Sequence, residues 1–185
     1  SYPWGDVKFL SFMEPISPSI MFDVLFVAIF CYIKRDLIGT IRPMITIKRI
    51  IIVSLVAVFC IIISVNFSLN SPFRYLELIF FQLLIIAPIL EELIFRGVFL
   101  ELGERAQLRG KVNILLNSML FSFSHLPAIW VLNEEFHSFI GFQLIYTLIL
   151  GYLCALSRMR TKGVLEPIIL HFFFNSCTYA VSYTQ

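Results

Sequence analysis

Residues 74–102 read RYLELIFFQLLIIAPILEELIFRGVFLEL, a long apolar run whose second half carries two adjacent glutamates, Glu91 and Glu92, and Arg96. A transmembrane helix needs about 20 mostly apolar residues, so this run is long enough to cross a bilayer. Pro88 within it predicts a kink or a break in the helix. Charged side chains inside such a helix are rare and mark functional sites by default. This stretch therefore indicates a membrane protein and the region that carries its chemistry.

The composition of the whole chain supports the same conclusion. Of its 185 residues, 59% are hydrophobic and only 14% are charged. Soluble domains are close to half apolar and about a quarter charged, so a soluble globular domain is disfavoured. A disordered chain is excluded, because it needs low hydrophobicity and high charge. The net charge is only +2, so nothing points to nucleic acid as a partner, and the expected partner is the lipid bilayer.

The apolar runs predict an all-α fold, a polytopic transmembrane helix bundle with about six spans. The expected spans are 19–33, 50–65, 74–102, 112–132, 136–156 and 164–183. We expect one membrane domain over 1–185, in which 1–18 is an interfacial segment. Residues 19–65 then supply two accessory spans, and 74–183 supply the core spans that carry the site.

The basic residues predict an orientation in the membrane. Eleven of the fourteen Lys and Arg residues lie in 34–49, 103–111 and 157–162. Because cytoplasmic loops carry an excess of Lys and Arg, we expect these three loops to face the cytoplasm. The expected location is a cell membrane, and the Ile- and Phe-rich, Gly-poor composition favours a bacterial plasma membrane.

Helix geometry separates the charged residues of the third span. Glu92 and Arg96 are four positions apart, so they share a helix face and can form an ion pair. Glu91 is rotated by about 100° from Glu92 and need not join that pair. A purely structural ion pair is the alternative interpretation, but it leaves Glu91 unexplained.

Two further spans carry polar residues at a similar depth. His125 lies in the fourth span, and His171 and Asn175 lie one turn apart in the sixth. Counted from the cytoplasmic ends at 1.5 Å per residue, these residues and Glu91 are about 12–20 Å deep, near the middle of a hydrocarbon core about 30 Å thick. A lone buried histidine is usually a satisfied core residue, but this set indicates a shared internal site.

This set of residues suggests hydrolysis of an amide bond with water as the nucleophile. A glutamate beside a histidine can deprotonate water, and a second histidine with an asparagine can stabilise the oxyanion. Neither a GxSxG nor an HExxH motif is present, so neither a serine nucleophile nor a standard zinc motif is indicated. A zinc ion bound by Glu91, His125 and His171 remains the alternative.

Three spaced motifs resemble those of a known family. They are EExxxR at Glu91–Arg96, FxxxH at Phe121–His125 and HxxxN at His171–Asn175. In this order they resemble the CPBP or Abi family of intramembrane endopeptidases, which includes CAAX proteases and bacteriocin-processing proteins. The resemblance covers about residues 74–180.

The resemblance implies an α-helical membrane endopeptidase and a role for each motif residue. In it Glu91 and His125 activate the water, His171 and Asn175 stabilise the oxyanion, and Glu92 and Arg96 are supporting residues. It favours a glutamate-type mechanism with no cofactor, and zinc remains the alternative. The implied substrate is a membrane-associated peptide or protein.

Six spans are fewer than the eight typical of the prenyl endopeptidases, which makes a prenylated substrate less favoured. Two other classes remain as alternatives. One is a non-catalytic membrane immunity or scaffold protein that binds a peptide or signalling partner. The other is a transporter, which would usually show a repeat and paired broken helices. No feature of the sequence determines an oligomeric state.

Overall fold

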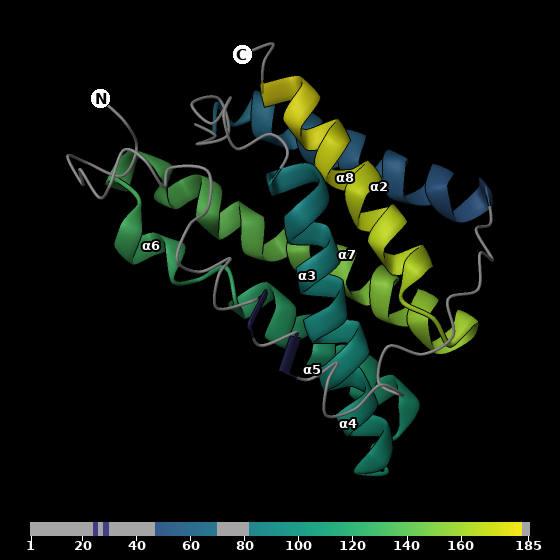
Figure 1. Cartoon of the computed structure of the whole chain (residues 1–185). Helices are drawn as coiled ribbons and strands as arrows, with labels where there is room; N and C mark the ends of the chain where they lie inside the picture. Colours follow the sequence, from purple (N-terminus) through teal and green to yellow (C-terminus); the bar gives the residue numbers. More distant parts are fainter. Residues whose placement is uncertain (1–23, 26–27, 30–46, 70–81, 183–185) are drawn as a thin grey trace.

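The computed structural model describes residues 24–25, 28–29, 47–69 and 82–182, and the regular elements within them are helical (Figure 1). They are α2 (Ile47–Asn66), η4 (Gln82–Ile86), α3 (Ala87–Glu92), η5 (Leu93–Phe99), α4 (Leu100–Arg105), α5 (Gly110–Phe123), α6 (Ala128–Val131), η6 (Glu134–Phe136), α7 (His137–Thr161) and α8 (Leu165–Ser182). The predicted all-α class is therefore confirmed for this part of the chain.

Within these residues, three helical segments are long and apolar enough to cross a membrane. They are Ile47–Asn66, Gly110–Val131 and Glu134–Thr161, and they correspond to the second, fourth and fifth predicted spans. α8 occupies the position of the sixth and carries Glu166 and His171 among its apolar residues. The protein is thus a helical membrane protein, and the number of six spans stays a prediction.

Several predicted segments lie outside the described residues. These are the interfacial segment 1–18, the first part of the third span at 74–81, and most of the first span at 19–33. Within that first span, 24–25 and 28–29 are helical. The basic segment 34–49 is described only from Ile47 onward.

The described part of the third span is one continuous helix, so of the kink or break predicted at Pro88 the break is absent. η4, α3, η5 and α4 follow one another from Gln82 to Arg105, and the backbone stays helical at the junction residues Ile86 and Leu93. Proline removes one helical hydrogen bond and crowds the preceding turn. The turn before Pro88 has the wider π-helical form, which is one of the ways a helix absorbs such a distortion.

The fourth predicted span, 112–132, is not a single helix. α5 ends at Phe123, a turn follows, and α6 is one short turn of helix beyond Pro127. The turn is closed by tight bonds in which the His125 N–H donates to Ser122 O at 3.1 Å and the Leu126 N–H donates to Phe123 O at 3.0 Å. Pro127 disfavours helix in the residue before it, and as a result His125 lies on a turn at the end of α5.

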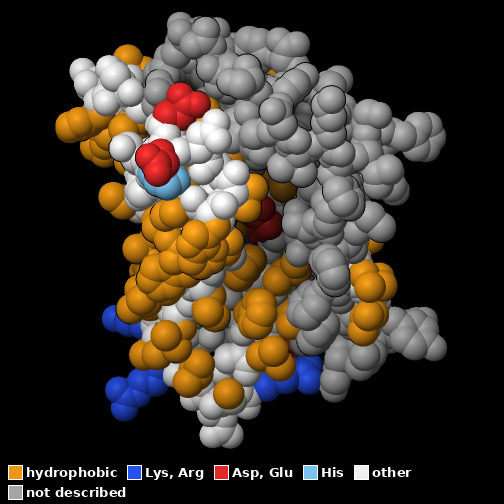
Figure 2. Space-filling model, turned by 90° about the vertical axis from the view of Figure 1, so that its left-hand side faces the viewer, with side chains coloured by type: hydrophobic (Ala, Val, Ile, Leu, Met, Phe, Trp, Pro, Cys, Tyr) orange, Lys and Arg blue, Asp and Glu red, His pale blue; other side chains and the backbone are white. Residues whose placement is uncertain are grey.

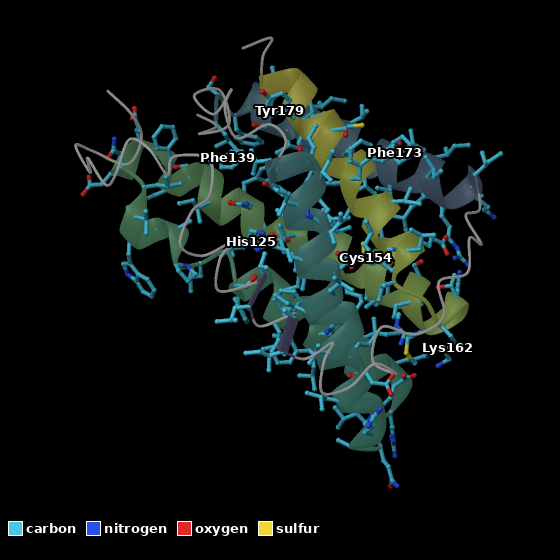
Figure 3. All side chains as sticks on the ribbon, in the orientation of Figure 1. His125, Phe139, Cys154, Lys162, Phe173 and Tyr179 are labelled. Carbon is cyan, nitrogen blue, oxygen red and sulfur yellow. The ribbon has the colours of Figure 1, made fainter. Side chains whose placement is uncertain are left out.

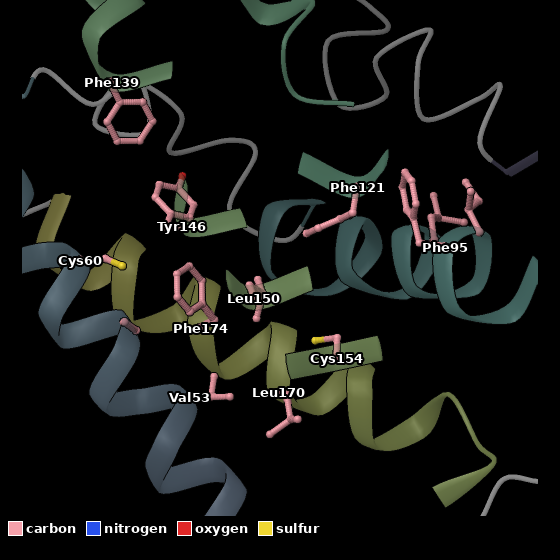
Figure 4. Close-up of a cluster of buried hydrophobic side chains, with 13 residues drawn as sticks. Val53, Cys60, Phe95, Phe121, Phe139, Tyr146, Leu150, Cys154, Leu170 and Phe174 are labelled. Carbon is pink, nitrogen blue, oxygen red and sulfur yellow. The ribbon is translucent and has the colours of Figure 1, made fainter. Parts of the chain in front are cut away.

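α7 is the central helix of the described part. It packs against α5 and α8, and α8 in turn packs against α2 (Figure 1). Side chains from these helices form one buried core, drawn in Figure 4. Tyr146 of α7 stacks on Phe174 of α8 with ring centroids 5.5 Å apart, and Phe121 of α5 is fully buried. This core holds the three helices in register and so fixes the polar residues that they carry.

The outer surface has the polarity expected of a membrane protein. Figure 2 shows a broad band of hydrophobic side chains with Lys and Arg at one end and acidic side chains at the other. Leu55 and Phe59 of α2 and Leu115 and Leu120 of α5 are all more than half exposed. Such large exposed apolar areas are suited to contact with lipid.

The helices extend into the predicted basic loops, so those loops are shorter than predicted. Arg105 is the last residue of α4, and Arg158 belongs to α7 rather than to a loop at 157–162. Arg158 is buried, its Nε donates to Arg96 O at 3.3 Å, and its Nη2 lies 3.6 Å from Glu101 Oε2. The sequence analysis counted Arg158 as a loop charge, whereas in the structure Arg158 joins α7 to η5 and α4.

Candidate active site

Glu92 and Arg96 form a completely buried ion pair. Both side chains are 0% exposed, and Arg96 Nη1 lies 3.0 Å from Glu92 Oε1, as their spacing predicts. Arg96 Nη2 donates to Gly151 O of α7 at 3.0 Å. The guanidinium also lies over the ring of Phe121, 4.4 Å from its centroid, a favourable cation–π arrangement. The pair therefore joins the third helix to α5 and α7.

Two glycines allow the helices around the ion pair to approach closely, Gly151 beside Arg96 and Gly103 beside Asn113. A Cβ on Gly151 would lie 3.0 Å from the Phe121 ring and 3.4 Å from Arg96 Nη2. A Cβ on Gly103 would overlap the amide of Asn113, which donates to Leu100 O at 2.8 Å and holds α5 against α4.

His171 shares the same carboxylate oxygen. Its Nδ1 lies 2.9 Å from Glu92 Oε1, and its side chain is 5% exposed. A carboxylate only accepts hydrogen bonds, so Nδ1 carries the hydrogen. The other ring nitrogen, Nε2, lies 3.8 Å from Glu91 Oε2. Glu92 therefore sets the orientation of the imidazole and leaves Nε2 on the side of Glu91.

Glu91 differs from Glu92 in its surroundings. Its side chain is 27% exposed and lines a cavity of about 150 Å³. The cavity is lined by Leu83, Leu84, Ala87, Glu91, His125, Gln143, Tyr146, Thr147, Leu150, His171, Asn175, Thr178 and Tyr179. The structure thus brings together the four residues that the sequence singled out for chemistry.

His125 reaches the cavity from the turn after α5. Its Nδ1 lies 3.0 Å from Phe121 O and 3.4 Å from Ser124 Oγ. Because the carbonyl only accepts, Nδ1 carries the hydrogen and Nε2 is an acceptor with no partner among the residues that the structure describes. Figure 3 shows His125 in the middle of the molecule, between Tyr179 toward the end of α8 and Lys162 beyond the end of α7.

Phe121 lies between the two histidines. Its ring is edge-on to His125 at 5.2 Å and to His171 at 5.6 Å between centroids. Such edge-to-face contacts fix the orientation of both rings. The phenylalanine of the FxxxH motif therefore contacts Arg96 and both histidines.

Asn175 lies one turn beyond His171 on α8 and is half-buried. Its Nδ2 donates to Leu83 O of η4 at 3.0 Å. An amide nitrogen has two hydrogens, so this bond leaves one available for the cavity. The bond to η4 also holds α8 beside the helix that carries Glu91.

The residues fit a metal ion poorly. No group of three or more His, Cys, Asp or Glu side chains lies close enough to hold one in the part of the chain that the structure describes. The alternative zinc set of Glu91, His125 and His171 is thus not arranged as a ligand cluster.

One ion pair near the site was not foreseen. Arg49 Nη1 of α2 lies 2.6 Å from both carboxylate oxygens of Glu166, whose side chain is 0% exposed. The sequence placed Arg49 among the loop charges, although an acid in the first turn of an apolar helix was a signal for a buried partner. This pair fixes α2 to the start of α8, the helix that carries His171 and Asn175.

Comparison with known proteins places this arrangement in context. Residues 73–177 match the family model described as type II CAAX prenyl endopeptidase Rce1-like. CAAX prenyl protease 2 of Caenorhabditis elegans is 33% identical over 100 residues, which are 50% of this chain and 37% of that protein. CAAX prenyl protease 2 of Arabidopsis thaliana is 31% identical over 108 residues, 55% of this chain and 35% of that protein.

The chain spans about a third of the length of these curated relatives. The matched region contains the three motifs and the cavity residues from Leu83 to Asn175. No solved structure matches the chain.

Proposed function

This chain belongs to the type II CAAX prenyl endopeptidase Rce1-like family, and from that membership we propose that it is an intramembrane endopeptidase. It hydrolyses a peptide bond of a membrane-bound or lipid-associated protein. One observation carries the proposal: Glu91, His125, His171 and Asn175 line a single cavity among apolar helices. Polar groups at such a depth are costly unless they have a function.

The first step of the proposed mechanism is the activation of water. The cavity of about 150 Å³ has room for water. Glu91 removes a proton from a water that His125 Nε2 orients as an acceptor. The hydroxide oxygen then bonds to the substrate carbonyl carbon. When the C–N bond breaks, the proton held by Glu91 passes to the leaving nitrogen.

The second element is stabilisation of the oxyanion. As the carbonyl carbon becomes tetrahedral, its oxygen takes up negative charge. His171 Nε2 and Asn175 Nδ2 lie one turn apart on one face of α8 and would both donate to that oxygen. Since Nδ1 of His171 already donates to Glu92, donation from Nε2 requires an imidazolium.

The mechanism proposed is of the glutamate type and needs no cofactor. The carboxylate of Glu91 is the base, and both histidines are held by hydrogen bonds to protein groups at Nδ1. The separate hydrogen-bond partners of the two histidines support the glutamate-type mechanism. The Phe121 carbonyl fixes the ring of His125, and the Glu92 carboxylate fixes the ring of His171.

The membrane orientation belongs to the same proposal. We propose that the ends of α4 and α7, with their basic residues, face the cytoplasm, as the positive-inside rule expects. Labelling of a single cysteine introduced at Gly110 from the outside of intact cells would contradict this orientation. The two relatives above come from an animal and a plant, so the bacterial membrane expected from composition finds no support in them.

The experiment that tests the function is cleavage of a small panel of peptides by the purified chain in detergent. The panel holds a farnesylated peptide ending in a CAAX sequence, the same peptide without lipid, and a short transmembrane peptide. Because both relatives are named CAAX prenyl proteases, the lipidated peptide is tested first. Binding without cleavage of every peptide would instead favour the non-catalytic immunity or scaffold alternative.

A further inference from the structure

The wall of the cavity that α7 supplies contains a polar group that the mechanism does not use, the side-chain amide of Gln143. The neighbouring hydroxyl of Thr147 donates within its own helix, to Gln143 O at 2.7 Å and Leu144 O at 3.3 Å. Tyr146 packs its ring against Phe142 and against Phe174, which lies beside it in Figure 4. In contrast, no hydrogen bond to the Gln143 amide is present among the residues described.

Gln143 is half-buried and lines the cavity within a helix long and apolar enough to cross the membrane. Its amide, which has no partner among the described residues, can bond to a ligand that enters the cavity.

A peptide substrate has a matching need. Its carbonyl carbon is open to attack only where the chain is unwound, and unwinding frees the N–H and C=O groups on either side of the cleaved bond. Unsatisfied backbone groups are strongly unfavourable in an apolar environment. Some proteases bind these groups with the edge of a β-sheet. The described elements around this cavity are helices and the turn that carries His125, with no strand among them. Among the described residues, polar side chains in the cavity wall are therefore the groups that can supply the bonds.

We infer that Gln143 binds a backbone peptide group of the substrate next to the cleaved bond; this inference rests on the endopeptidase function proposed above. Its NH2 group donates and its carbonyl oxygen accepts, so one side chain can pair with both the C=O and the N–H of an extended peptide. Gln143 lies on α7, whereas Glu91 lies on α3 and Asn175 on α8. It is thus a positioning residue that holds the unwound segment across the cavity in register with the base and the oxyanion donors.

Backbone ester substrates test this role directly. An ester replaces the peptide N–H by oxygen and weakens the carbonyl as an acceptor. Two substrates are made, each with one ester in place of the peptide bond on one side of the cleaved bond. For the wild-type chain, kcat/KM for one of the two esters should fall about 3- to 10-fold below the all-amide substrate, as the loss of one hydrogen bond implies.

Gln143→Met keeps the length of the side chain and removes its hydrogen bonds. With the all-amide substrate, the kcat/KM of Gln143→Met should be about 3- to 10-fold lower than that of the wild type, mainly because KM rises. With the sensitive ester, the variant and the wild type should have the same kcat/KM. Ile145→Met is the matched control, since Ile145 is on α7 but 59% exposed on its outer face. This variant should discriminate between amide and ester as the wild type does.

Several results would overturn the inference. Equal kcat/KM for all three substrates in the wild type would do so without any variant, and so would additive effects of Gln143→Met and the ester. If Gln143→Met fails to fold, Gln143→Asn replaces it, and the shortened amide should lose the ester discrimination. No cleavage of any substrate by the wild type would overturn the proposed function and this inference together, whereas cleavage without coupling counts against Gln143 alone.

Discussion

Nδ1 of His171 lies 2.9 Å from Oε1 of Glu92, although the two residues are 79 positions apart in the chain. The same oxygen accepts a hydrogen bond from Arg96 at 3.0 Å. Glu92 therefore has two partners, and only Arg96 was expected from helix periodicity. The glutamate pair thus divides into one carboxylate that holds its neighbours in place and one, Glu91, that lines the cavity.

The double contact of Glu92 predicts a structural defect in Glu92→Gln. The change leaves Arg96 as a buried charge without its counter-ion, which costs about 3–5 kcal/mol of unfolding free energy. Adding Arg96→Met should restore part of the melting temperature, because the stranded charge is gone. Turnover should stay low, since His171 still lacks its carboxylate.

The matched control combines Arg96→Met with Glu91→Gln. Arg96→Met should not raise the melting temperature of Glu91→Gln, because Glu91 does not pair with Arg96. A stable but inactive Glu92→Gln beside an unstable Glu91→Gln would show that the two carboxylates have the opposite roles.

Asn175 is expected to act mainly on the rate, and its replacement also removes the hydrogen bond to Leu83 O that holds α8 beside η4. Asn175→Leu removes one oxyanion donor, so kcat should fall about 10²- to 10³-fold. Ser176→Ala is its neighbouring control, because the Ser176 hydroxyl donates to Phe172 O within α8 at 2.8 Å. Single-turnover kinetics would measure the chemical step in Asn175→Leu and in Ser176→Ala. Equal rates in the two variants would show that Asn175 has no part in the mechanism.

Gly151 is a test of the packing that surrounds Arg96. Gly151→Ala places a methyl group 3.0 Å from the Phe121 ring and 3.2 Å from the Ser118 backbone, so it should destabilise the protein by about 1–3 kcal/mol. Gly141 lies in the same helix with nothing within 4 Å of an added Cβ. Gly141→Ala should be neutral or stabilising, by up to about 1 kcal/mol. Thermal melting of both variants in detergent measures the difference, and equal shifts would argue against close packing at Gly151.

Removal of metals tests the glutamate-type mechanism. Since the described residues hold no cluster of three ligands, strong chelation should leave turnover unchanged, and the purified chain should contain no stoichiometric zinc. If chelation abolished turnover and added zinc restored it, then Glu91, His125 and His171 would have to be reassigned as ligands.

Some of these relationships were readable from the sequence and some were not. The apolar runs predicted helices, the four-residue spacing predicted the contact between Glu92 and Arg96, and similar depths suggested that Glu91 and His171 could meet. Contacts such as Glu92 with His171 depend on the register between helices. That register follows from how side chains interlock in the core, which periodicity along one helix does not determine.

Two further misjudgements have specific physical causes, one local and one distant in the sequence. Pro127 was taken as part of the fourth span, yet its missing N–H ends α5 early and places His125 on a turn. Arg49 and Arg158 were treated as loop charges because basic residues near span ends usually are. Here Glu166 and Arg96 O are their partners, and neither partner is near in sequence.

The most direct test of the central claim compares the wild type with Glu91→Gln on a peptide that the wild type cleaves. Glu91 is partly exposed to the cavity and lies 3.8 Å from His171 Nε2, beyond hydrogen-bond distance, so the variant should melt close to the wild-type temperature. Its turnover should be lower by about 10²- to 10⁴-fold, the contribution of a general base. A folded Glu91→Gln that cleaves at the wild-type rate would contradict the account.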